Sequence, residues 1–482
     1  MNRRMILHIL GRILLVEAAL MLPSVAVGII YSEKATVSFL VPIVLLVLLG
    51  AYPAFKKPQS SAIYARDGFF IVASAWILMS LAGSLPFFFS GHFNSYIDSL
   101  FEIVSGFTTT GASVIATPEE LPHCILFWRS FSHWIGGMGV LVFVLAIMPL
   151  SDDRSLCLMR AEAPGPIVGK LVPRMRDTAK ILYGVYSVMT ILLFVLLVIG
   201  KMPVFDALCN AFATAGTGGF GVHSASIALY DSAYIEIVIA VFMLLFGINF
   251  NLFYLLLIRR VKLFFKNEEL RWYVVIVALS TAAITLNLVI LTEQAFGLSL
   301  RHAFFQVASI MTTTGFSTFD FAAAPYFTQH LLLLLMIVGA CAGSTGGGLK
   351  ISRLIILVKT FFQEVRRLLH PRAVSVVRLD GKAVDRQTIH GVLSYFVAYI
   401  AIICLTTLLL SLDKYGFTTN FSATLACFNN IGPGLDAVGP TGNFGGFSAF
   451  SKLLLSFNML LGRLEILPMM ILFTPDVWRK NA

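Results

Sequence analysis

The sequence predicts an all-α polytopic membrane protein in which one helical unit occurs four times. Three observations lead to this prediction: the composition, ten long apolar runs and a glycine-centred segment that recurs. Of the 482 residues, 58% are hydrophobic and only 12% are charged. One soluble core cannot hide so much apolar surface, so the lipid bilayer must solvate much of the chain.

Ten apolar runs are long enough to cross the hydrocarbon core, which is roughly 30 Å thick and needs about 20 helical residues. Six of them are nearly free of charge, and four carry a few charged residues. The ten predicted spans are Ile13–Tyr31, Val37–Phe55, Phe69–Ser90, Leu121–Leu150, Ile181–Gly200, Ala233–Ile258, Trp272–Leu291, Leu331–Leu349, Ile389–Leu412 and Leu453–Phe473.

The basic residues lie on one side of the predicted topology. The net charge is +10, which could suggest a nucleic-acid partner. Threading ten spans instead places most Lys and Arg residues in the loops that share a side with the N-terminus, and the positive-inside rule makes that side cytoplasmic. We therefore expect contact with membrane lipids, no nucleic-acid partner, and both termini in the cytoplasm. The six cysteines show neither a CxxC pair nor metal-ligand spacing, so we interpret them as apolar packing residues.

Four segments share a short amphipathic stretch that leads into a glycine turn. They read SLFEIVSGFTTTGAS, ALCNAFATAGTGGF, AFFQVASIMTTTGFS and ATLACFNNIGPG, and they align on Gly111, Gly218, Gly315 and Gly432. Each short stretch is about three turns long, so it can enter the membrane but cannot cross it. Irregular backbone at membrane depth is tolerated only where it is buried in protein or lines a water-filled cavity. Four such loops predict a central polar pathway.

Backbone carbonyls from four loops around one axis can replace the water shell of a cation. Glycine suits such a turn because it accepts positive φ. A glycine that merely ends a helix explains any one of the four, but not four in register. The residues predicted to contact the ion are Thr110, Gly111, Thr217, Gly218, Thr314, Gly315, Ile431 and Gly432. Those predicted to line the filter beside them are Thr108, Thr109, Gly216, Gly219, Thr312, Thr313, Asn429 and Asn430.

At these loops the chain resembles the Trk/Ktr/HKT superfamily of potassium transporters, specifically its bacterial TrkH-type membrane subunit. The resemblance covers nearly the whole length and rests on the order of TTTGAS, TGGFG, TTTGFS, NNIGPG, HWIGGMGV, GSTGGGLK and GRLEIL. It implies four M1–pore helix–M2 repeats in a pseudo-tetrameric, channel-like arrangement, with two extra N-terminal transmembrane helices. It also implies a homodimer in the bacterial cytoplasmic membrane, with K⁺ as the transported ion and no tightly bound cofactor.

The resemblance also bears on selectivity. Family members with glycine at the first-loop position favour potassium, whereas serine there is associated with sodium transport in some plant relatives. This chain has Gly111. The second and fourth loops lack the triple threonine of the first and third, so we expect one or two defined sites and looser discrimination than in a strict multi-site filter.

The glycine spacing divides the chain into a helix pair and four units. We expect the helix pair in residues 1–60, and the units in residues 61–155, 156–266, 267–370 and 371–482.

Arg463 lies about midway along the last apolar span. A charge near the bilayer centre is costly and usually faces a protein interior or a cavity. The resemblance places the matching arginine below the filter, where it would form an electrostatic barrier to cations. The alternative is an ion pair with Glu465 or Glu236.

Glycines interrupt the second span of the third unit. Each interior glycine costs a helix about 1 kcal/mol relative to alanine, so we expect this stretch to be unwound. The resemblance assigns it as a gate under the filter, with Lys350 beside it. Close helix packing by small residues is the alternative. A phosphate-binding loop is disfavoured because Leu349 separates the last glycine from the lysine. The predicted gating residues are Gly343, Ser344, Thr345, Gly346, Gly347, Gly348, Lys350 and Arg463.

Three further charged residues lie inside predicted spans. Arg129 either satisfies carbonyls behind the filter or extends to the membrane interface. Glu17 and Glu236 either relay protons or brace neighbouring helices.

The longest polar segment, Phe362–Arg386, is basic. Such a segment contacts lipid headgroups or solvent. By resemblance it also lies where a cytoplasmic nucleotide-binding regulatory ring of the TrkA or KtrA kind docks.

Two other function classes remain as alternatives. A sodium- or proton-coupled cation symporter would use the same pathway. A membrane-embedded lipid-modifying enzyme would need clustered carboxylates or histidines, but the nine histidines are scattered singly and there is no HExxH motif. We therefore expect a transporter and not an enzyme.

Overall fold

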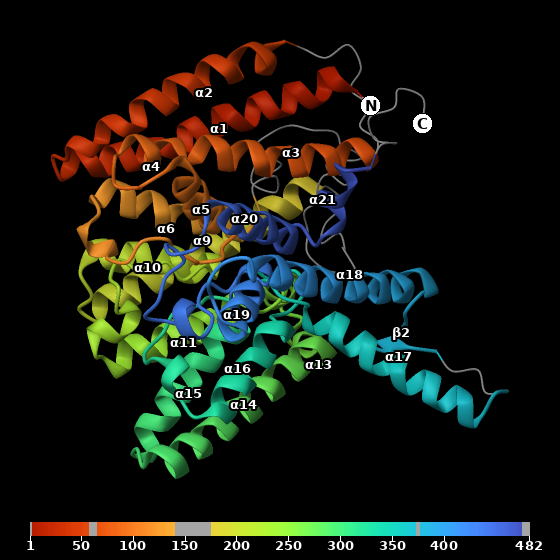
Figure 1. Cartoon of the computed structure of the whole chain (residues 1–482). Helices are drawn as coiled ribbons and strands as arrows, with labels where there is room; N and C mark the ends of the chain where they lie inside the picture. The colour runs from red at the N-terminus through yellow and green to blue at the C-terminus, as the bar shows by residue number, and fades with distance from the viewer. Residues whose placement is uncertain (1, 57–64, 140–174, 373–375, 475–482) are drawn as a thin grey trace.

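A computed structural model describes residues 2–56, 65–139, 175–372 and 376–474. These residues are almost entirely helical (Figure 1). Their two strands, β1 (Arg378–Leu379) and β2 (Lys382–Ala383), form one antiparallel hairpin. In the described residues, six helical segments are long and apolar enough to cross a membrane.

Two long antiparallel helices, α1 (Arg3–Ile30) and α2 (Val37–Phe55), lie together along one side of the molecule (Figure 1). They approach most closely where glycine faces glycine. A Cβ on Gly11 would lie 2.9 Å from the carbonyl oxygen of Gly50, and the reverse distance is 2.8 Å. Small residues at a helix crossing let the two backbones pack tightly in a membrane.

The rest of the chain repeats one order of elements four times: a long helix, a short helix, a loop and a second helix. The long helices are α3 (Ala65–Gly83), α9 (Met175–Ile199), α14 (Glu268–Thr292) and α18 (Arg386–Leu410). The short helices are α5 (Tyr96–Phe107), α10 (Val204–Gly216), α15 (Phe296–Met311) and α19 (Phe417–Phe428). The second helices are α6 (His123–Gly137), α11 (Ala233–Phe246), α16 (Tyr326–Val338) and α20 (Ala449–Arg463).

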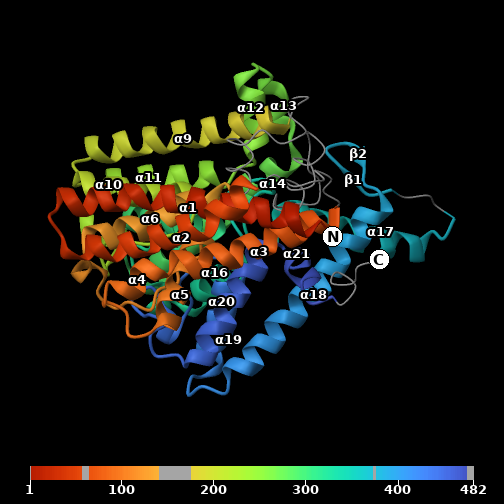
Figure 2. The ribbon, with the colours of Figure 1, turned by 90° about the horizontal axis from the view of Figure 1, so that it is seen from above.

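The remaining elements are helices α4 (Leu85–Phe89), α12 (Phe250–Leu257), α13 (Val261–Lys266), α17 (Ile351–Leu369) and α21 (Leu467–Ile471), with 3₁₀ turns η1 (Lys34–Thr36), η2 (Pro118–Glu120), η3 (Ser226–Tyr230), η4 (Phe321–Ala323) and η5 (Asp436–Val438). Helix α17 and the hairpin project from one end of the body (Figures 1 and 2).

The second helix of each unit is shorter than the continuous span predicted from its apolar run. Helix α11 ends at Phe246, and the chain turns by 93° into α12. Helix α16 ends before Gly339, which has φ +70°. Helix α20 ends at Arg463. The continuous spans predicted at Ala233–Ile258 and Leu453–Phe473 were therefore wrong, because hydropathy reports burial and not helical continuity. The break in the third unit was expected from its glycines. The predicted span Leu121–Leu150 is helical to Gly137 and then runs into residues outside the described ranges.

Local capping explains where several helices begin. Side-chain oxygens of Ser95, Ser232, Asn267, Asp385 and Ser448 accept hydrogen bonds from the first-turn N–H groups of α5, α11, α14, α18 and α20. A cap of this kind satisfies one of the N–H groups that have no partner inside the helix.

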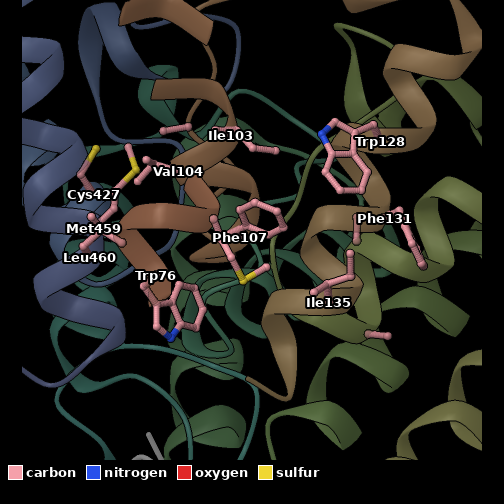
Figure 3. Close-up of a cluster of buried hydrophobic side chains, with 14 of the residues drawn as sticks. Trp76, Ile103, Val104, Phe107, Trp128, Phe131, Ile135, Cys427, Met459 and Leu460 are labelled. Atoms are coloured by element: carbon pink, nitrogen blue, oxygen red, sulfur yellow. The ribbon is translucent and has the colours of Figure 1, made fainter. Parts of the chain in front are cut away.

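The short helix α5 is held by a buried aromatic cluster (Figure 3). The ring of Phe107, at its C-terminal end, lies edge-on to Trp128 of α6, with 5.9 Å between centroids. The indole N–H of Trp128 donates to the carbonyl of Gly83 at 3.0 Å. The cluster therefore fixes the point at which α5 turns into the first loop.

The predicted boundaries at residues 60 and 155 lie outside the described ranges. The division of the chain into one helix pair and four units therefore stays a prediction.

Candidate functional site

Each short helix ends in a loop with the same backbone conformation. Two residues with positive φ, separated by one residue, occur in every loop. The first of each pair is Thr109 (+56°), Thr217 (+55°), Thr313 (+61°) or Asn430 (+57°), and the second is Gly111 (+82°), Gly219 (+76°), Gly315 (+87°) or Gly432 (+96°). The residue between them donates its N–H back to the short helix in all four loops, as in the bond from Thr110 to Ser105 at 2.8 Å.

This conformation corrects the register of the second loop. The sequence alignment centred that loop on Gly218, but the residue with the matching φ is Gly219. Gly218 instead corresponds to Thr110, Thr314 and Ile431, because its N–H donates to Ala213 at 2.8 Å as theirs do to their own short helices. Because Gly218 and Gly219 are adjacent, the sequence could be aligned on either, and only the backbone φ values distinguish them.

The four loops pack in a closed ring. A Cβ added to Gly111 would meet the carbonyl oxygen of Gly218. Around the ring, Gly219 faces Thr314, Gly315 faces Ile431, and Gly432 faces Thr110 at 2.8 Å. In each loop, the carbonyl of the residue that precedes the positive-φ glycine therefore packs against the positive-φ glycine of the neighbouring loop. A side chain at any of these glycines would push the loops apart.

A cavity of about 110 Å³ lies at this ring, and its lining includes all four corresponding glycines: Gly111, Gly219, Gly315 and Gly432. Gly218 is not among its lining residues, which agrees with the corrected register. Most of the other lining residues follow these glycines in the chain, including Ser113, His223, Ser317 and Pro433, and Arg129 of α6 also lines the cavity.

Side-chain hydroxyls brace two of the loops from within. Thr108 and Thr110 are joined by a 2.8 Å hydrogen bond, and Thr312 and Thr314 by another of 2.8 Å. The fourth loop is braced differently. Asn430 donates to the hydroxyl of Thr110 and to the carbonyl of Met459, each at 3.0 Å, while Asn429 accepts a 2.9 Å bond from Tyr399.

The glycine-rich segment 339–350, named here the intramembrane loop, is non-helical and lies directly against the base of the ring. Gly347 donates its N–H to the Thr313 hydroxyl at 2.6 Å. The Thr217 hydroxyl lies 3.3 Å from that of Thr345. A Cβ on Gly347 would also overlap the carbonyl of Asn429. The intramembrane loop thus touches the second, third and fourth loops of the ring. The unwound conformation predicted for this segment is what the structure shows.

Arg463, at the end of α20, contacts backbone carbonyls. Its guanidinium donates to Thr345 at 2.9 Å, to Gly137 at 2.7 Å, and also to Gly136. The acids considered as its partners are engaged elsewhere: Glu465 pairs with Arg353, and Glu236 pairs with Arg301 at 3.1 Å. Arg463 therefore ties the intramembrane loop to the end of α6.

Two residues that the sequence did not single out also hold the intramembrane loop. The buried carboxylate of Glu269, on α14, accepts from the N–H of Ala342 at 2.7 Å and from that of Ser352 at 3.1 Å. It therefore joins both ends of the loop. Arg353 donates to the carbonyl of Leu349 at 3.5 Å, lies over the ring of Tyr395 at 4.1 Å and pairs with Glu465. Lys350 is buried and donates to the carbonyl of Gly346.

Arg129 is buried behind the first loop of the ring. It is 2% exposed and forms an ion pair with Glu102 of α5 at 2.6 Å. Glu236 braces two helices through Arg301. Glu17, in contrast, is fully buried, and its carboxyl has no hydrogen-bond partner within the described residues.

A family model described as a cation transport protein, TrkH, matches residues 36–480. The chain belongs to the TrkH family. The Trk system potassium uptake protein TrkH of Salmonella typhimurium is 36% identical over the full length of both chains. The Trk system potassium uptake protein TrkG of Escherichia coli K12 is also 36% identical, over 99% of both chains.

The solved structures agree with this assignment. The crystal structure of the potassium transporter TrkH from Vibrio parahaemolyticus has a TM-score of 0.90 at 35% identity, and covers 99% of this chain and 100% of that one. The predicted TrkH-type family and all-α membrane fold are thereby confirmed. The chain is a multi-pass membrane transport protein, since its named relatives are transporters and not enzymes.

Proposed function

We propose that this chain carries potassium ions into a bacterial cell through the ring of four loops. The observation that carries the proposal is the closed contact between each glycine and the carbonyl of the next loop. Four loops in one conformation around one axis can supply carbonyl oxygens that replace the hydration shell of K⁺. The named relatives, as potassium uptake proteins, support the choice of ion.

In this proposal the ion meets the carbonyls of two residues in each loop. The corrected set is Thr110, Gly111, Gly218, Gly219, Thr314, Gly315, Ile431 and Gly432. Only the first and third loops have internal hydroxyl pairs, so the ring is not fourfold symmetric in its side chains. Unequal loops favour a single well-defined site over a row of equivalent ones.

The same contacts suggest how the pathway closes. The intramembrane loop contacts three filter loops from one side, and Arg463 holds it there with a positive charge. A cation passing the ring would meet both a steric block and a repulsive charge in a water-poor interior, where charge interactions are strong. Conduction therefore requires the loop to move away from Thr313 and Thr217.

Three further features complete the proposal. The protein lies in the cytoplasmic membrane with both termini inside, as the distribution of basic residues favours. It forms a homodimer with one pathway in each protomer. A cytoplasmic nucleotide-binding ring regulates it through the face that carries α17, where Arg366 and Arg367 are exposed.

Growth of a bacterial strain that lacks its own potassium uptake systems tests this function. We expect the intact chain, expressed with its regulatory partner, to restore growth at low potassium concentration. A Gly315→Asp variant, which places a side chain where the Ile431 carbonyl lies, is expected not to. Failure of the intact chain to support growth, despite its presence in the membrane, would contradict the proposal.

A coupled symporter is the second candidate, because Glu17 is a buried carboxyl with no hydrogen-bond partner in the described residues. Exchange of a proton at such a buried carboxyl would couple ion movement to the proton gradient. Ion uptake against an imposed proton gradient distinguishes the two candidates. A passive pathway gives uptake that follows only the potassium gradient, whereas coupled transport depends on both gradients and is altered by Glu17→Gln.

A further inference from the structure

Phe220, the residue after the second filter glycine, lies between two side chains of α6. The guanidinium of Arg129 is 4.0 Å from the centroid of its ring. The imidazole of His133 is 4.3 Å away on a nearly parallel plane, at 21°. Arg129 and His133 are four residues apart, so they project from the same face of the helix. Phe220 is 1% exposed. We name these three residues the Phe220 stack.

His133 also shapes the backbone of the second filter loop. A Cβ on Gly218 would overlap the His133 ring, and a Cβ on Gly216 would overlap the His133 carbonyl. Both positions must therefore be glycine so that this loop can lie against α6. Neither glycine has the positive φ that the ring glycines require. Glycine is needed at these two positions because it has no side chain, and not because it tolerates positive φ.

The second loop has less internal bracing than the first and third loops. The first and third loops have hydroxyl pairs at the positions that Gly216 and Gly218 occupy in the second. Among the described residues, the Thr217 hydroxyl bonds to the carbonyl of Gly216 and to Thr345 of the intramembrane loop. If the intramembrane loop moves during conduction, the contact with Thr345 is lost. The second loop is then held mainly by the Phe220 stack.

The stack is itself anchored to the first loop. Arg129 donates to Glu102 at 2.6 Å and to Ser113 at 3.3 Å, and it also donates to the carbonyl of Gly221 at 3.1 Å. Glu102 in turn accepts from Ser113 and from the N–H of Val114. One buried network therefore joins the segments that follow Gly111 and Gly219.

We infer that the Phe220 stack positions the second filter loop and thereby sets how well the ring discriminates among monovalent cations. This inference rests on the proposed function. Phe220 borders the cavity at the ring but is almost fully buried, and His133 is fully buried. Both therefore act on the ion through the loop, as positioning residues. The physical reason is that no side chain of the second loop braces Gly218. Its position is fixed instead by packing against the imidazole of His133.

The test compares Phe220→Leu with Phe220→Tyr in the full-length protein reconstituted in liposomes. Leucine removes both stacking contacts at similar volume, whereas tyrosine retains them. We expect Phe220→Leu to lower the ratio of rubidium to sodium uptake by about three- to tenfold, the factor that corresponds to losing one or two aromatic contacts. Phe220→Tyr should keep the wild-type ratio. His133→Leu should lower the ratio as Phe220→Leu does.

Phe87→Leu is the matched control. Phe87 is as buried as Phe220 and stacks on Phe93 at 5.0 Å, but it lies on α4 and is part of none of the four loops. We expect this control to lower thermal stability without changing the uptake ratio. If Phe220→Leu transports with the wild-type ratio, or if Phe87→Leu lowers the ratio equally, the inference is wrong.

Hydrogen exchange of the purified protein gives a readout that does not need transport. Peptides that cover residues 213–222 should exchange faster in Phe220→Leu and His133→Leu than in the wild type, while peptides from the third loop should not. Unchanged exchange in 213–222 would overturn the inference. Absence of rubidium uptake by the wild type would instead contradict the proposed function and leave the exchange result to decide the role of the stack.

Discussion

The guanidinium of Arg463 donates a hydrogen bond of 2.9 Å to the carbonyl oxygen of Thr345, and so joins the last residue of α20 to the intramembrane loop. The same side chain reaches Gly136 and Gly137 at the end of α6. Three segments that are distant in sequence therefore meet at one charge beside the ring of four loops. Removing that charge should loosen the closed arrangement.

Arg463→Ala is expected to raise rubidium uptake by about tenfold, because hydrogen bonds from a charged group each contribute about 1.5–3 kcal/mol. Arg463→Lys keeps the charge but cannot donate to three carbonyls in the same fork-like geometry, so its uptake should lie between that of the wild type and that of Arg463→Ala. Liposome flux at equal protein density is the measurement. Uptake that stays at or below the wild-type level in a folded Arg463→Ala protein would contradict a gating role.

Gly347→Ala is expected to increase ion uptake and to make that uptake independent of the regulatory partner. A Cβ at Gly347 would overlap the carbonyl of Asn429, so the intramembrane loop could no longer lie against the ring. Gly391→Ala is the matched control, since nothing lies within 4 Å of a Cβ there. Flux assays with and without the regulatory partner measure the effect. Equal behaviour of both variants and wild type would show that the contact does not hold the pathway closed.

Gly111→Ser is expected to loosen selectivity towards sodium. Its Cβ would displace the Gly218 carbonyl, and the positive φ of Gly111 adds about 1 kcal/mol of strain for any L residue. The ratio of rubidium to sodium uptake should fall. An unchanged ratio would remove Gly111 from the filter.

Gly219→Ser tests the corrected register. If Gly219 corresponds to Gly111, its serine variant should lower the uptake ratio as Gly111→Ser does, because its Cβ meets the Thr314 carbonyl in the same way. A wild-type ratio in Gly219→Ser would restore the original alignment on Gly218.

Glu33→Gln is expected to destabilise the fold at neutral pH but not in acid. Glu33 accepts hydrogen bonds from the first two N–H groups of α6, those of His123 at 2.7 Å and Cys124 at 3.0 Å, and so caps that helix from another segment. Burial raises the pKa of Glu33, but the hydrogen bonds from Cys124 and His123 outweigh this effect and hold the pKa below its usual value of 4.5.

The sign of the pH effect follows from that lowered pKa. The carboxylate stabilises the fold above the ordinary carboxyl pKa, and this contribution is lost as the pH falls through the lowered value. We expect Glu33→Gln to cost about 1 kcal/mol at pH 7, the typical value of a helix cap, and progressively less in acid. Thermal unfolding in detergent measures this, with the exposed Glu120→Gln as control. A difference that is constant with pH would show that the charge is not the cause.

Much of this architecture was predictable because it repeats. Apolar runs of membrane length gave the long helices, and four glycine turns between them gave the ring, since the bilayer tolerates irregular backbone only around a protected pathway. The register of Gly219 was not predictable. Two adjacent glycines satisfy the same pattern, and only the backbone φ separates them.

Side-chain contacts between the units also could not be predicted from the sequence. Glu269 lies in the first turn of α14, where acids are common, so nothing marked it as the carboxylate that joins both ends of the intramembrane loop. Phe220 appeared as one of 41 phenylalanines. Its position between Arg129 and His133 depends on how α6 packs against the second unit, which no local pattern records.

The most direct test of the central claim is rubidium uptake into liposomes by the purified protein with its partner, with potassium or sodium as competitor. A filter built from Gly111, Gly219, Gly315 and Gly432 predicts uptake that potassium suppresses more strongly than sodium does, and a smaller difference in Gly219→Ser. No uptake, or equal suppression by both ions in the wild type, would contradict it.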